Sequence, residues 1–354
     1  MIAPCRLSPF IEPSAVEAWD AWFRWRDQDG LHDLSIEDTW WRVADALASV
    51  EVIGEAAAWR SRFLDAMATW RLLPDERLLA SAGTGRQEWR EGSLHAVLNL
   101  AAFVPADNPR TWIDTAAIAD YAELAVRVLD NAALLASMAP PSLRIGMTGV
   151  ADALALLGLA YDSEQGRAQA AEWAAALAEG CLRGNVKLSA ARGAPTGHPQ
   201  DALARAWVRD MPIELLRDAE RHGLRHPQLT TISSQRRLAL LANDVADALD
   251  PLTEWRGPGS STSGAAATRP VGYARHILRA RGSDPGVAES AGMSLNAQLT
   301  MRAAVQPWMD EPIAYPVLLE HEPDAREQRE AGLIAVRHRL GELSWRKPAA
   351  PVPA

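Results

Sequence analysis

The chain has 354 residues, of which 48% are hydrophobic and 23% charged, a composition typical of soluble globular proteins. Its formal net charge of −9 argues against a general binder of nucleic acid or anionic membranes, because the phosphates would repel it. No apolar run reaches transmembrane or signal-peptide length, so we expect a cytoplasmic protein. Two cysteines, Cys5 and Cys181, are too few for a disulfide framework or a four-cysteine zinc site.

The first 84 residues predict a helical lobe. Apolar residues recur at helical spacing over 13–25, 35–47 and 54–70, and the second of these segments opens with a capping box at Ser35. Tryptophans occupy the apolar faces of all three segments. We interpret them as core residues rather than as a cofactor site.

The middle of the chain alternates strands with helices, which predicts an α/β domain over residues 85–316. We expect strands near 94–103, 142–147, 228–232 and 312–317. The helices expected between the first three strands are Ile113–Leu135, Ala151–Leu159 and Gln165–Arg192. The first of these helices has an apolar stripe containing Leu124 and Val128, which we expect to pack across a subunit boundary.

The stretch His226–Leu252 predicts a strand, a turn and a helix in succession. Gln228–Ile232 is a short apolar and β-branched run, Ser233 and Ser234 offer N-cap hydroxyls, and a helical stripe runs over 235–249 before Asp250-Pro251 ends it. A helix N-terminus behind a strand suits a phosphate. The candidate phosphate-binding residues are Thr231, Ser233, Ser234, Gln235, Arg236 and Arg237. The same pattern is also that of a capped helix with two solvated arginines.

The end of the chain predicts a flexible loop at 257–268 and, over 317–354, a C-terminal helix with a disordered Pro/Ala-rich tail. The histidines show none of the usual metal-binding spacings. His222 and His226 are four residues apart, but Gly223 and Pro227 interrupt a helix there, so no metal site is expected.

Several motifs resemble the large chain of ribonucleotide reductases, especially the adenosylcobalamin-dependent class. Gln228–Ile232, Leu240–Ala242 and Asp250-Pro251 are similar to the family segment QLTTIAPTGTISLLAGN…GIEP. Leu143–Ser163 is similar to RIGLGVTGLADALAMLGLRYDS, and 93–104 to CNLGSINLAKFV. The resemblance covers most of 36–316 in family order. It implies that the turn after Ile232 derives from a substrate-phosphate cradle, although Ser234 and Arg236 replace the proline and glycine of that turn.

The resemblance also exposes what this sequence lacks. After Gly83-Thr84-Gly85 the family continues for several hundred residues, whereas here a few polar residues lead directly into the segment at 93–104. This implies a large internal deletion between about residues 85 and 92. The family motif Asn-Pro-Cys-Gly-Glu, which carries the thiyl-radical cysteine, has no counterpart, and Ser93 falls at the second redox cysteine. The tail holds no Cys-x-x-Cys.

We therefore expect a mainly helical α/β protein, with an N-terminal helical lobe and a reduced remnant of the reductase barrel. The first hypothesis is a non-catalytic protein, with no catalytic residue or cofactor of its own, that binds a partner chain or, weakly, a nucleotide phosphate. The partner would be a second copy or a reductase-type chain. The alternative is one subunit of a split ribonucleoside-diphosphate reductase, in which another chain carries the deleted half and adenosylcobalamin is required.

Overall fold

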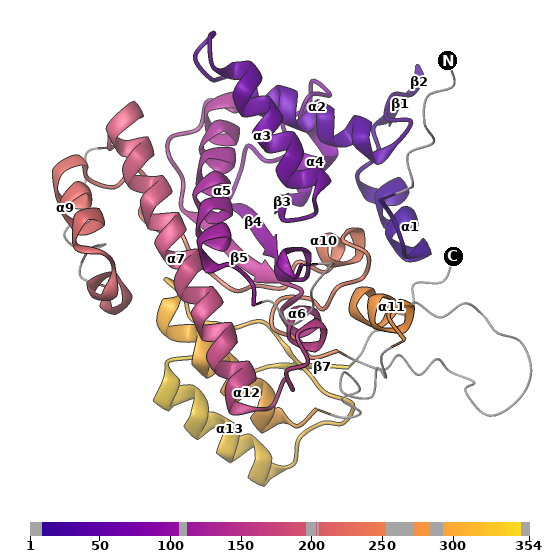
Figure 1. Cartoon of the computed structure of the whole chain (residues 1–354), viewed down its shortest axis with the longest axis vertical. Helices are drawn as coiled ribbons and strands as arrows, with labels where there is room; N and C mark the ends of the chain where they lie inside the picture. The colour runs from indigo at the N-terminus through magenta and orange to yellow at the C-terminus, as the bar shows by residue number, and fades with distance from the viewer. Residues whose placement is uncertain are drawn as a thin grey trace, which may run out of the picture.

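The computed structural model describes residues 9–105, 112–195, 203, 205–252, 272–282 and 293–347. Cys5, the loop expected at 257–268 and the terminal residues of the expected tail lie outside these ranges. The N-terminal lobe forms one end of the molecule, and the C-terminal helices form the other (Figure 1).

The N-terminal lobe is helical, as predicted. Its helices and the small hairpin between the first two are α1 (Pro13–Trp22), β1 (Arg26–Asp27), β2 (Gly30–Leu31), α2 (Ile36–Ala48), α3 (Ala56–Ala68) and α4 (Glu76–Ser81). The capping box at the start of α2 is confirmed, because the Ser35 and Asp38 side chains both bond the opposite backbone. Trp40 is buried in the core with Phe63, as expected for this lobe, whereas Trp41 is half exposed.

A small sheet lies between the lobe and the C-terminal helices. It consists of β3 (Leu72–Pro74), β4 (Leu94–Asn99) and β5 (Leu143–Thr148) in that order, with β3 antiparallel and β5 parallel to β4. The segment 228–231 continues the sheet beside β5. The N–H of Ile145 donates to the carbonyl of Leu229 at 2.8 Å, and the N–H of Thr231 donates to the carbonyl of Ile145 at 3.1 Å.

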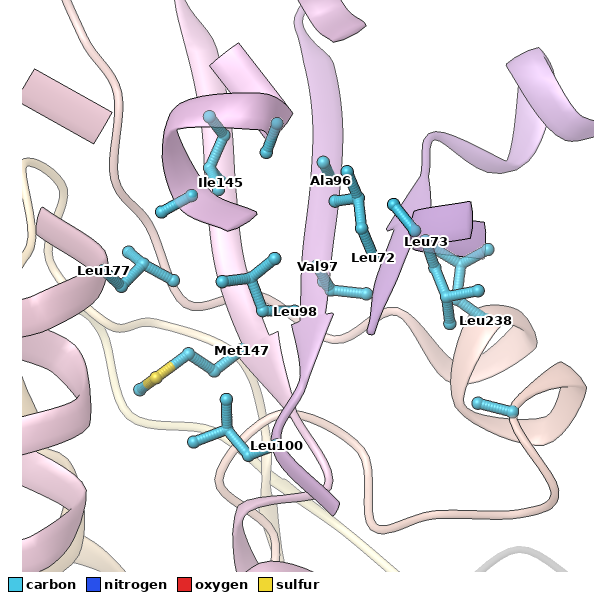
Figure 2. Packing of buried hydrophobic residues seen from close by; sticks show 14 of the residues in the cluster. Leu72, Leu73, Ala96, Val97, Leu98, Leu100, Ile145, Met147, Leu177 and Leu238 are labelled. Carbon is cyan, nitrogen blue, oxygen red and sulfur yellow. The ribbon is translucent and has the colours of Figure 1, made fainter. Parts of the chain in front are cut away.

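Two long helices, α5 (Thr115–Leu135) and α7 (Glu164–Arg192), cover one face of the sheet. Figure 2 shows Leu177 of α7 beside Met147 of β5 on this face. On the other side Leu238, from α10 (Arg236–Leu241), lies near Leu73 of β3 (Figure 2). The sheet is thus an apolar layer between helices.

The expectation that the apolar stripe of α5 forms a subunit boundary is wrong. Leu124 and Val128 are buried inside the chain, where α5 packs along α7. The two helices approach closely because α7 has glycines at the crossing. A Cβ atom at Gly180 would lie 2.0 Å from the carbonyl oxygen of Ala119. The stripe is therefore an internal helix contact.

The remaining elements surround this core. They are η1 (Leu100–Phe103), α6 (Val150–Leu156), η2 (Ala206–Asp210), α9 (Ile213–His222), α11 (Tyr273–Ala280), α12 (Leu295–Val305), η4 (Gln306–Trp308), β6 (Val317–Leu318), α13 (Ala325–His338) and β7 (Trp345–Arg346). β6 and β7 form a separate parallel pair.

The strand predicted over 312–317 is wrong except at its last residue, where β6 begins. The preceding backbone bonds to side chains instead of to a neighbouring strand. The N–H of Ile313 donates to Oε1 of Gln306 at 2.8 Å, and Nη1 of Arg302 donates to the carbonyl of Tyr315 at 2.6 Å. Proline at 312 and 316 also removes two N–H donors that a ladder would need.

The predicted fold class is confirmed: the protein is mainly helical α/β, with a helical lobe and a small sheet domain. Within the described residues, no helix combines the length and the apolar character needed to cross a membrane.

Candidate functional site

The candidate phosphate site lies where the 228–231 segment turns into α10. This helix is shorter than predicted, because it ends at Leu241 instead of continuing to residue 249. Asn243 and Asp244 have φ values of 65° and 55°, in the left-handed region that a right-handed helix cannot use. Asn243 is held there by accepting a hydrogen bond from the N–H of Ile11 at 2.8 Å.

The predicted capping role of the two serines is also wrong. The N-cap residue of α10 is Gln235, and no side chain caps the helix directly. Instead, the Ser234 hydroxyl donates to Oδ2 of Asp247 at 2.5 Å, and the backbone N–H of Gln235 donates to Oδ1 of the same carboxylate at 2.8 Å. The chain's own buried carboxylate therefore occupies the position expected for an anion. Phosphate binding here stays a prediction, and a phosphate would have to displace Asp247.

The other predicted site residues face different partners. The Thr231 hydroxyl lies 3.4 Å from Oε2 of Glu311, and Ser233 accepts from the side-chain amide of Gln235 at 3.3 Å. The two arginines are exposed, and each faces a carboxylate at 3.5 Å: Arg236 faces Asp244, and Arg237 faces Glu76. The structure brings together only Ser234 and Gln235 of the predicted set around one acceptor.

A second polar group lies on the α10 side of the sheet and was missed by sequence reasoning. His95 of β4 and Arg144 of β5 are register partners. Nδ1 of His95 is 3.3 Å from Nε2 of Gln235, and Arg144 pairs with Glu311 at 2.8 Å. Burial lowers the pKa of His95, which favours a neutral imidazole. The sequence carried one signal for this pair. His95 and Arg144 are each the second residue of an otherwise mostly apolar strand.

This polar group has no paired nucleophile and base. Ser233 bonds the Gln235 amide, which lies between it and His95. The charges of Arg144 and Glu311 neutralise each other. Among the described residues, no cluster of three or more His, Cys, Asp or Glu side chains could hold a metal ion.

The carboxyl-terminal edge of the parallel strands is where open α/β sheets usually bind ligands. Here the segment 243–250 lies across that edge. The carbonyl of Ala246 accepts from the N–H of Gly149 at 2.8 Å and from the Thr148 hydroxyl at 3.0 Å, directly at the end of β5. The N–H of Ala246 donates to Asp152 at 2.6 Å. Further along, the carbonyl of Leu249 accepts from the Tyr161 hydroxyl at 2.6 Å. The chain's own backbone thus covers the carboxyl end of β5.

Two buried carboxyl groups hold this closing segment. Burial raises the pKa of Asp152 to about 6, although it accepts two backbone N–H groups, from Ala246 and Ala274. Burial also raises the pKa of Asp250 to about 7, although Arg346 pairs with it. Both groups are fixed to the protein itself, so we interpret their shifts as a cost of packing rather than as acid–base machinery.

The thiol of Cys181 lies on the α7 side of the sheet, opposite His95 and Arg144. It is fully buried in α7, one helical turn after Leu177, which packs on β5 from the other side of the sheet. Burial raises the pKa of the Cys181 thiol well above its ordinary value, so the reactive thiolate is disfavoured. This places the cysteine in the core.

The lateral edge of the sheet, formed by segment 228–231, is capped by the side chain of Asp310. The N–H groups of Leu229 and Thr230 both donate to Oδ2 of Asp310, at 2.7 and 3.1 Å. The other oxygen of this buried carboxylate bonds Arg205 at 2.9 Å and Nε1 of Trp207 at 3.2 Å. Two donors that a further strand would use are therefore already bonded. At the opposite edge, β3 is three residues long and ends in proline, which offers no N–H.

Two family models match the chain. The model described as ribonucleotide reductase, all-alpha domain, matches residues 21–87, which include the helical lobe from α2 to α4. The model described as ribonucleotide reductase, barrel domain, matches residues 94–264, which include β4, β5 and α10. Together they cover about two thirds of the 354 residues. No curated protein matches the chain.

Proposed function

The chain belongs to the ribonucleotide reductase large-chain family, and from that premise we propose that it is a non-catalytic member which acts by binding another protein chain. The observation that carries the proposal is the closed carboxyl-terminal edge of the sheet. Segment 243–250 fills the place where a substrate would be expected, and its backbone groups are bonded at both Ala246 and Leu249.

The distribution of sulfur supports the same proposal. The chemistry implied by the family resemblance needs a radical cysteine with acid–base partners and a pair of redox thiols. The sequence has two cysteines, and Cys181 is packed in the core behind the sheet. Among the residues that the structure describes, the polar side of the sheet, where His95 and Arg144 lie, carries no thiol.

Activity assays test the non-catalytic proposal directly. Purified protein with adenosylcobalamin, a dithiol and each ribonucleotide should form no deoxyribonucleotide above the blank. Product formed by the wild type and abolished by Cys181→Ser, with circular dichroism showing both proteins folded, would overturn it.

Binding to another chain is supported by adjacent apolar side chains that face solvent. Val52 and Ile53, in the turn between α2 and α3, are 71% and 99% exposed. Single exposed apolar residues are ordinary, but two neighbours that expose this much of their surface favour a contact site. We propose a second copy of this chain as the partner, ahead of a complete reductase. The capping of the sheet edge by Asp310 weighs against a split enzyme, because the missing half of the barrel would need that edge.

Sedimentation tests the partner proposal. At tens of micromolar the wild type should be dimeric, and a Val52→Ser/Ile53→Ser variant should be folded and monomeric. Ile213→Ser is the matched control, because Ile213 is 53% exposed on α9, away from the turn between α2 and α3. A monomeric wild type that also fails to bind a purified reductase chain would contradict the proposal.

A further inference from the structure

Segment 243–250 (the strap), which covers the carboxyl end of β5, has a strained backbone. Asn243, Asp244 and Ala248 have φ values of 65°, 55° and 52°, in the left-handed region. Asparagine and aspartate tolerate this region, but an alanine there brings its Cβ close to the following carbonyl oxygen. Such conformations persist only where the surrounding structure enforces them. The strap therefore depends on its attachments to the rest of the chain.

One of these attachments comes from the C-terminal strand β7. Nη2 of Arg346 donates to Oδ2 of Asp250 and lies 3.8 Å from Oδ2 of Asp247. Both carboxylates belong to the strap, and both are buried. Asp247 also accepts from the Ser234 hydroxyl and from the backbone N–H of Gln235. A single guanidinium nitrogen thus connects β7 to the part of the strap that lies against the start of α10.

The contact between Arg346 and Asp250 is incomplete on both sides. Nε of Arg346 and Oδ1 of Asp250 are buried atoms without a hydrogen-bond partner among the described residues. Burial raises the pKa of Asp250 to about 7 although the guanidinium lies beside it, so the ion pair does not fully offset the loss of water around the carboxylate. Both groups gain hydrogen bonds from water when they separate, which favours a contact that can be released.

The other arginines near Asp250 are bonded elsewhere. Arg302 of α12 donates to the backbone carbonyl groups of residues 315 and 316, and Arg236 of α10 faces Asp244 at 3.5 Å. Without Arg346, the two carboxylates that it contacts would have no ion-pair partner among the described residues. The charge of Arg346 is therefore what holds this part of the strap in its buried position.

Strand β7 has few attachments of its own. Among the described strands it pairs with β6, where the N–H of Val317 donates to the carbonyl of Ser344 at 2.8 Å and the N–H of Leu319 donates to the carbonyl of Arg346 at 2.9 Å. An isolated two-stranded pair is marginally stable in water. β7 can therefore leave its place without disturbing the three-stranded sheet.

We propose that β7 and the strap form a conformational device, in which release of Arg346 lets the strap move off the carboxyl end of β5. In the closed state, the carbonyl of Ala246 accepts from the N–H of Gly149 at 2.8 Å and from the Thr148 hydroxyl at 3.0 Å. In the open state these two donors face solvent and can bond another molecule. Opening supplies no thiol, so this device is compatible with the non-catalytic proposal and does not depend on it.

Hydrogen exchange at about pH 8, where the carboxylates of the strap are ionised, tests the device. The amide of Gly149 reports opening of the strap, and the amide of Ile145, which is bonded inside the sheet, reports opening of the sheet. Gly149 should exchange faster than Ile145 already in the wild type. In Arg346→Gln, exchange at Gly149 should rise about tenfold while Ile145 is unchanged. Lys347→Gln is the matched control, because Lys347 is the exposed neighbour of Arg346, and it should follow the wild type.

A lysine at position 346 separates the charge of the side chain from its packing. The contact uses Nη2 alone, so an ammonium group can replace it, and Arg346→Lys should restore slow exchange at Gly149. Unchanged exchange at Gly149 in Arg346→Gln would overturn the proposal. Equal increases at Gly149 and Ile145, or equal exchange in the Lys and Gln variants, would also contradict it, because Arg346 would then stabilise the whole fold or act through packing.

Discussion

At the scale of single residues, the predicted phosphate site shows how far local sequence reasoning reaches. The donors at the start of α10 are present: Ser234 and the N–H of Gln235 point at one acceptor, as a phosphate cradle would need. The acceptor is Asp247, twelve residues beyond Gln235, which the predicted helix over 235–249 placed in its last turn. Its role could not be inferred, because it depends on the left-handed residues Asn243 and Asp244 that fold the chain back.

Replacing Asp247 tests this arrangement. Asp247→Asn keeps an oxygen for the N–H of Gln235 but cannot accept from Ser234 in the same way, so we expect a loss of about 1–2 kcal/mol in the free energy of unfolding. Ser234→Ala removes the same hydrogen bond by removing its donor. In urea unfolding, the double variant should therefore lose less than the sum of the two single losses. Strictly additive losses would mean that Ser234 and Asp247 do not interact.

At the scale of elements, the long helices were predictable and short or irregular segments were not. α5 and α7 begin and end within about two residues of their expected bounds, because their periodicity and caps are local properties. By contrast, the end of α10 and the conformation of segment 312–316 depend on side chains from other elements. Gln306 and Arg302 bind the backbone that a strand would otherwise use. A single sequence does not show which helix will supply such partners.

The crossing of α5 and α7 gives a prediction at this scale. Gly180→Ala places a Cβ 2.0 Å from the carbonyl oxygen of Ala119, so the helices must separate, and we expect a loss of at least about 2 kcal/mol in unfolding free energy. Gly332→Ala in α13 is the matched control, because its Cβ would meet nothing within 4 Å. It should instead gain about 0.5–1 kcal/mol from helix propensity. Equal losses at both positions in urea unfolding would show that the close crossing is not the cause.

At the scale of the whole molecule, the sequence indicated a shortened family member, and the family models agree on the two regions. The strands β4 and β5 and the extended segment 228–231 were also predictable, since each carries a recognisable motif. The contacts that satisfy the edge of this small sheet in the absence of further barrel strands were not predictable. The edge is capped by Asp310, about 80 residues away in the chain, and by Arg205 and Trp207 from a third segment. Such a contact leaves no periodic signal.

This capping yields the last prediction. Asp310→Ala leaves the N–H groups of Leu229 and Thr230 without their acceptor and leaves Arg205 without its carboxylate. Breaking a buried charged contact of this kind should lower the free energy of unfolding by about 3–5 kcal/mol. The neighbouring Glu311→Ala is the control. Its partner Arg144 is about one third exposed, so the loss should be below about 1 kcal/mol.

Hydrogen exchange separates the edge-capping role of Asp310 from a general loss of stability. In Asp310→Ala the amides of residues 229 and 230 should exchange faster than those of β4, relative to wild type, because the edge donors are freed while the inner strand stays paired. Freed edge donors can also pair with another chain, so sedimentation should show association beyond the wild-type state that increases with concentration. Uniformly faster exchange, with an unchanged association state, would mean that Asp310 stabilises the fold but does not prevent the edge from pairing with another chain.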